Sequence, residues 1–142
     1  MRAVRAVAFA ALAFAAALAI FFTIGWFQFD NLEPDSFILL LAILAFNLAC
    51  VPWLSRRGPQ TRLAEAGLWL VISGVGIGFI LILSGFWVDL LLPPVVGVET
   101  AMHRLLRALQ ILIVFSWIGI ATLVVGWGLW LAAFLLGRRA AA

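Results

Sequence analysis

The only histidine of the chain, His103, has the most versatile side chain for chemistry. An imidazole can ligate haem iron or a pigment metal, but a bis-histidine haem needs two such residues, whereas a chlorophyll-type pigment needs one axial ligand. Arg104 and Arg107 lie beside it, and guanidinium groups favour phosphate. We expect these three residues to contact a lipid headgroup or a pigment, and we favour the headgroup.

Neutral polar side chains interrupt the apolar stretches at four notable positions: Asn47, Ser73, Ser84 and Gln110. Ionisable residues deep in a membrane usually mark functional sites, yet Glu65 and Asp89 stand near the ends of their apolar stretch. A transporter coupled to protons or cations usually keeps a carboxylate near the midplane, so this pattern disfavours one. We expect the four neutral residues to form intramembrane polar contacts, as hydrogen bonds between helices of about 0.6–2 kcal/mol.

Catalytic and metal-binding patterns are not evident in the sequence. Cys50 is the single cysteine, so it supplies neither an internal disulfide nor a paired metal or redox motif. No nucleophilic triad and no pair of catalytic carboxylates can be assigned. We therefore predict no catalytic residues, no metal site and no intrinsic cofactor, and we expect a protein that is not an enzyme.

Glycines fall where helices could pack closely. Gly74 and Gly78 form a small-xxx-small pair, a spacing that lets helix backbones approach one another. Gly126 and Gly128 lie in the last apolar stretch and are expected to act similarly. No strand or loop surrounds the glycines of residues 74–78, which argues against a nucleotide-binding loop.

The elements that must position these residues are apolar helices. Hydrophobic residues make up 67% of the 142, charged residues 11%, and the mean hydropathy is +1.24. Because about 20 apolar residues cross a bilayer as a helix, we predict an all-α integral membrane protein with four transmembrane helices in a single domain, residues 1–142. The predicted helices are residues 4–27, 36–54, 63–92 and 98–137. The first begins like a signal peptide, but its apolar run is too long for one.

Arginines predict the orientation of these helices. Seven arginines fall on one side and only Arg104 and Arg107 on the other, which places both termini in the cytoplasm by the positive-inside rule. The protein is then expected in a bacterial inner or intracytoplasmic membrane. Residues 98–109 repeat apolar side chains at three- and four-residue intervals, which predicts an interfacial amphipathic helix on the outer side, leading into the fourth helix. Six tryptophans stand near predicted helix ends and Trp117 lies deeper.

A non-enzymatic accessory subunit of a larger membrane complex is the function that this pattern favours. Such a chain would contact membrane lipids and other integral membrane subunits, in a respiratory or photosynthetic assembly whose pigment or quinone it could touch. An alternative is a small oligomeric transporter or channel with its pathway between protomers. A third hypothesis is a lipid enzyme at the outer interface. The basic charge, +3, reflects topology and does not predict a nucleic-acid partner.

Overall fold

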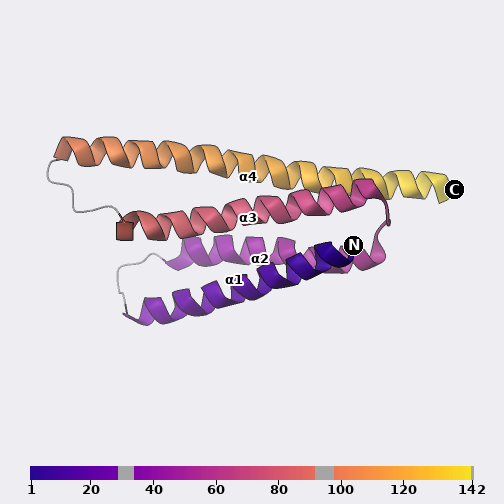
Figure 1. Ribbon diagram of the computed structural model, residues 1–142, viewed down its shortest axis with the longest axis horizontal. Helices are drawn as coiled ribbons and strands as arrows, with labels where there is room; N and C mark the ends of the chain where they lie inside the picture. Colours follow the sequence, from indigo (N-terminus) through magenta and orange to yellow (C-terminus); the bar gives the residue numbers. More distant parts are fainter. Residues whose placement is uncertain (29–33, 92–97, 142) are drawn as a thin grey trace.

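The protein is all-helical throughout the part that its computed structural model describes, which is residues 1–28, 34–91 and 98–141 (Figure 1). Within these ranges, side chains are not described at residues 22, 24–28, 34–37, 84–91, 98–105, 107–108, 111 and 141. The elements are α1 (Arg2–Gln28), α2 (Pro34–Arg57), α3 (Arg62–Leu91) and α4 (Val98–Ala141). Each bound lies within about one helical turn of the one predicted from sequence.

Local sequence explains where two of these helices begin and end. Pro34 opens α2, where its missing N–H is no loss and its fixed φ suits a helix. Arg56 and Arg57 close α2, where cations interact favourably with the helix dipole. Thr61 caps α3, because its Oγ1 accepts a hydrogen bond from the backbone N–H of Ala64 at 3.2 Å.

Helix α3 occupies the centre of the arrangement. It packs against each of the other three helices, and α1 and α2 also pack on one another. Within the described residues, the backbone of α4 comes close to α3 alone. The helices run alternately up and down, so both termini and the α2–α3 connection lie at one end of the bundle (Figure 1).

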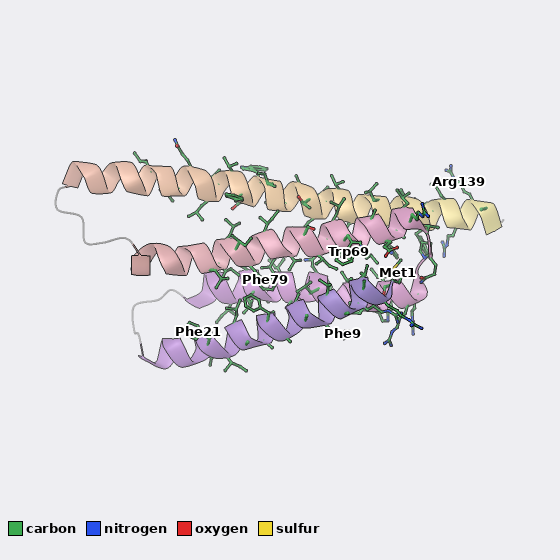
Figure 2. The ribbon with its side chains drawn as sticks, viewed as in Figure 1. Met1, Phe9, Phe21, Trp69, Phe79 and Arg139 are labelled. Atoms are coloured by element: carbon green, nitrogen blue, oxygen red, sulfur yellow. The ribbon has the colours of Figure 1, made fainter. Side chains whose placement is uncertain are left out.

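The buried core lies among α1, α2 and α3. One cluster, nearer the end where α1 finishes and α2 starts, comprises Ala15, Leu18, Leu41, Leu44, Leu48, Val75, Phe79 and Ile82. The other, near the termini, comprises Val4, Ala8, Val51, Leu68 and Val71. Phe79 points from α3 toward α1, where its ring meets that of Phe14 edge-on at 5.5 Å (Figure 2). Helix α4 only borders this core, through Leu123, Trp127 and Trp130.

Each of the four described helices contains a stretch long and apolar enough to span a membrane. The stretches are Arg2–Phe21, Ile38–Arg57, Arg62–Leu83 and Leu112–Ala140. Their burial differs greatly: 44% of the α3 window is buried inside the protein, against 11% of the α4 window. Helix α4 therefore presents most of its apolar surface outward.

Candidate functional site

Two pairs of glycines bring α3 and α4 into backbone contact. A Cβ added at Gly67 would lie 2.7 Å from the carbonyl oxygen of Gly126, and one at Gly126 would lie 2.8 Å from that of Gly67. Two helical turns further along α3, a Cβ added at Gly74 would lie 3.1 Å from the carbonyl oxygen of Gly119. These distances are shorter than ordinary van der Waals contact, so only glycine fits between the two backbones.

The spacing of these glycines differs from the one inferred from sequence. Gly74 and Gly126 do lie at the α3–α4 contact, but their companions are Gly67 and Gly119. Gly67 and Gly74 are seven residues apart on α3, and Gly119 and Gly126 are seven residues apart on α4, which is two helical turns in each case. That seven-residue repeat, shared by two antiparallel helices, is the signal that could have identified them.

The other predicted packing glycines have different surroundings. Gly78 faces α2, where an added Cβ would lie 2.7 Å from Cδ2 of Leu44. Gly128, in contrast, has nothing within 4 Å of an added Cβ. Within this chain Gly128 is therefore not a packing residue, because it lies on the side of α4 that α3 does not cover.

Asn47 links α2 to α4 by a hydrogen bond between side chains. The indole Nε1 of Trp127 donates to Oδ1 of Asn47 at 2.9 Å. The amide Nδ2 of Asn47 donates in turn to the carbonyl oxygen of Ile43 at 2.9 Å. Since the two helix backbones do not approach closely, this bond is the polar bridge between them. The predicted polar contact of Asn47 is thus occupied within the chain, by a tryptophan that the sequence did not single out.

The remaining residues of the predicted polar set are not joined to Asn47. Ser73 is exposed, and its Oγ donates to the carbonyl oxygen of Trp69 one turn earlier at 2.9 Å. Gln110 is exposed on α4, and the side chain of Ser84 lies outside the described residues. Among the described residues, hydrogen bonds connect no two members of this set. The described members of the set therefore form no continuous polar path within one chain.

Aromatic rings continue from this bridge along one side of α4. Trp127 meets Trp130 edge-on at 6.5 Å, and Trp130 stacks on Phe134 at 5.6 Å with an interplanar angle of 13°. The guanidinium of Arg138 lies over the ring of Phe134, 4.9 Å from its centroid. Nε1 of Trp130 is buried and has no hydrogen-bond partner. The row of rings thus leads from the Asn47–Trp127 hydrogen bond to the charged end of α4.

The end of the bundle that carries the termini is strongly basic. Its arginines are Arg2, Arg5, Arg56, Arg57, Arg62, Arg138 and Arg139. Figure 2 places Met1 and Arg139 together at this end. Glu65 is the carboxylate at this end, and its Oε1 lies 3.5 Å from the amino group of Met1. The side chains of the three residues predicted to contact a headgroup, His103, Arg104 and Arg107, lie outside the described residues.

Trp117 is the most exposed tryptophan of the described residues, at 69%. It precedes Gly119 by two residues, which is about 200° around a helix, so it points away from α3. Gly119 lies opposite Gly74, near the middle of the apolar stretch Arg62–Leu83. Trp117 therefore lies close to the level of the middle of the α3 stretch and points outward. Its indole N–H has no partner among the described residues.

Reactive groups do not converge in the described part of the chain. No three His, Cys, Asp or Glu side chains gather there as a metal site would require, and Cys50 is a free thiol. No protein-family model, no curated protein and no solved structure matches this chain. Any function must therefore be argued from the surfaces of the helices themselves.

Proposed function

We propose that the protein is an integral membrane protein with both termini on the cytoplasmic side of a bacterial inner or intracytoplasmic membrane. The four apolar helices supply the spans, and the arginine-rich end supplies the orientation. In this orientation the first turns of α4, residues 98–109, lie at the outer end of the bundle. They are not a separate interfacial helix, because α4 is one continuous helix from Val98 to Ala141 (Figure 1). The exposed apolar side chains of all four helices then face hydrocarbon instead of water.

Within the membrane, the protein acts as a non-enzymatic accessory subunit that docks through the outer face of α4 onto a helix of another membrane protein. The observation that carries this proposal is Trp117. Tryptophan prefers the membrane interface, where its N–H can reach water or headgroups. At mid-span, facing lipid, the N–H would have no acceptor, and an unsatisfied polar group in hydrocarbon costs several kcal/mol. A neighbouring helix that supplies an acceptor removes that cost.

The surroundings of Trp117 fit a helix partner better than lipid chains. Ile113, Ile120, Val124 and Leu131 are each at least half exposed and lie on the same side of α4, at intervals of three, four, seven and fourteen residues from Trp117. Such a stripe is the seam that packed helices use. Gly128 leaves an open notch in the same face, where a partner backbone could approach closely. Tryptophan is also enriched among residues that dominate binding energy.

The complex that receives this subunit is a helical membrane assembly, and respiratory and photosynthetic complexes with quinones or pigments are the first to test. The hydrogen bond between Asn47 and Trp127 favours this proposal over a transporter, because the most notable polar residue is already used inside the chain. The lipid-enzyme hypothesis rests on side chains at the outer interface that lie outside the described residues.

The test is purification of the chain from its native membrane in mild detergent, with Trp117→Leu expressed at natural abundance. The wild-type chain should run in a large particle, and mass spectrometry and an absorption spectrum identify its partners. Trp117→Leu should release the chain into a small particle. Trp53→Leu is the matched control: Trp53 is 56% exposed but stands near the arginine end, under Arg57, and should leave the particle intact.

Three results would contradict this proposal. A wild-type chain that runs alone has no partner subunit. A large particle made only of this chain makes the face of α4 a self-association surface. If the Trp117 and Trp53 variants run in particles of the same size, the mid-span indole of Trp117 does not hold the chain in the complex.

A further inference from the structure

In the described part of the chain, no carboxylate pairs with the arginines at the basic end of the bundle. Glu65 is the carboxylate at this end, and it lies beside the amino group of Met1. Among the described residues, no arginine forms an ion pair. Nε of Arg5 is buried without a hydrogen-bond partner. The described guanidinium groups of this end are therefore available to an anion from outside the chain.

Two of these arginines are held in position by aromatic rings. The guanidinium carbon of Arg57 lies 5.2 Å from the centroid of the Trp53 ring, and that of Arg138 lies 4.9 Å from Phe134. Phe134 is itself stacked on Trp130. Stacking orients the flat guanidinium but uses none of its five N–H donors, so the donors remain available to an anion. Both side chains are exposed, which keeps those donors accessible.

The two arginines flank the same contact between α4 and the α2–α3 connection. An added Cβ at Gly58 would lie 2.9 Å from Cζ2 of Trp130, and one at Gly137 would lie 4.0 Å from Cβ of Pro59. Arg57 directly precedes Gly58, and Arg138 directly follows Gly137. The backbone positions of the two ring-held arginines therefore lie at one corner of the bundle, which we call the arginine corner.

We propose that the arginine corner binds the phosphate of an anionic phospholipid headgroup through Arg57 and Arg138. Phosphate oxygens match the planar fork of a guanidinium, which can donate two parallel hydrogen bonds to them. A lipid accounts for the position of the corner, because exposed apolar side chains lie directly beside it on both helices: Trp53 on α2 and Leu135 on α4. These would contact the acyl chains, while the headgroup lies at the level of the arginines.

This inference rests on the membrane embedding proposed above and not on the docking of α4. The test uses the full-length chain, stripped of lipid in detergent and titrated with phosphatidylglycerol or phosphatidylcholine of identical acyl chains. Native mass spectrometry measures the occupancy of each lipid. The site variant is Arg57→Gln with Arg138→Gln. The control is Arg56→Gln with Arg139→Gln, which removes the same charge from the neighbouring positions that no described ring holds.

The wild-type chain should retain phosphatidylglycerol in preference to phosphatidylcholine. The site variant should weaken phosphatidylglycerol binding at least about tenfold more than the control, because it removes charge-assisted hydrogen bonds in addition to net charge. Equal losses in the two variants would reduce the corner to diffuse charge attraction and overturn the proposal. Melting curves of both variants, matched to wild type, exclude a loss caused by unfolding.

Two further arms separate the sources of failure. Inorganic phosphate at millimolar concentration should not displace phosphatidylglycerol, and displacement would assign the corner to free phosphate instead. Reconstitution into phosphatidylcholine vesicles, followed by alkaline carbonate extraction, tests the membrane embedding separately. A chain that is extracted refutes both proposals, whereas a chain that stays embedded without preferring phosphatidylglycerol refutes only this one.

Discussion

Alanine at position 126 should separate the two most tightly packed helices of the protein. The added Cβ would lie 2.8 Å from the carbonyl oxygen of Gly67, 2.8 Å from the backbone N of Val71 and 2.9 Å from its Cγ2. Two of these three atoms are backbone, so no side-chain rotation relieves the overlap. Helix α4 must move away from α3 instead, and it has no other helix backbone to rest on within the described residues.

The size of the effect follows from that displacement. Ordinary contacts begin near 3.4 Å, so the helices must part by about 0.6 Å. A gap of about 0.5–1 Å already loses a quarter to a half of the dispersion energy of each contact. Inserting a methyl group into a close-packed interior typically costs about 1–3 kcal/mol. We expect the cost of Gly126→Ala to lie near the upper end of this range. The Gly67–Gly126 contact lies inside the α3–α4 interface, which is the longest helix interface among the described residues.

Gly128→Ala is the matched control for this prediction. It lies on the same helix, and an added Cβ there has nothing within 4 Å. Any gain in helix propensity, at most about 1 kcal/mol, is common to both variants and cancels in their difference. The assay is reversible unfolding of the isolated chain from mild detergent into sodium dodecyl sulfate, followed by far-ultraviolet circular dichroism. Equal free energies of unfolding for the two variants would refute the close α3–α4 contact.

Three other substitutions test the packing in the same unfolding titration. Asn47→Leu removes the acceptor of the Trp127 indole and should lower the free energy of unfolding by about 0.6–2 kcal/mol. In a double-mutant cycle with Trp127→Phe, the interaction energy between the two positions should equal this cost, and additive effects would contradict the hydrogen bond. Gly78→Ala should cost less than the α3–α4 variant, because the three atoms nearest the added Cβ belong to the side chain of Leu44 and not to a backbone. Leu48→Ala should cost about 2–5 kcal/mol, since Leu48 is fully buried; a change below 1 kcal/mol would argue against the core.

The positions of the helices could be predicted from sequence because their signals are local. A run of about 20 apolar residues has few structural options, since backbone polar groups without water must pair within a helix. Gly58 and Pro59 follow two arginines after α2, and this combination marks a helix end by itself. The bounds of the described helices accordingly agree with the predicted ones to within about a turn.

The packing of the candidate site could be predicted only in part. Gly74 and Gly126 were identified as small residues, but a small-xxx-small pattern occurs at several registers of the same helix. Helix α3 is apolar on nearly every side, so its sequence carries almost no periodic signal for which side faces a neighbour. Gly67 was missed for that reason. Gly119 on α4 was missed as well, and Gly128 makes no packing contact within the chain.

The sequence by itself determined the four apolar stretches, the positions of the arginines along the chain and the position of Trp117 within the last stretch. These depend on composition and on distance along the chain, which tertiary packing does not change. Only the tertiary structure decided that Asn47 bonds Trp127 and that Trp117 points away from α3. Both depend on the rotation of each helix about its own axis. In an apolar helix that rotation is set by close packing against its neighbours and not by an amphipathic pattern.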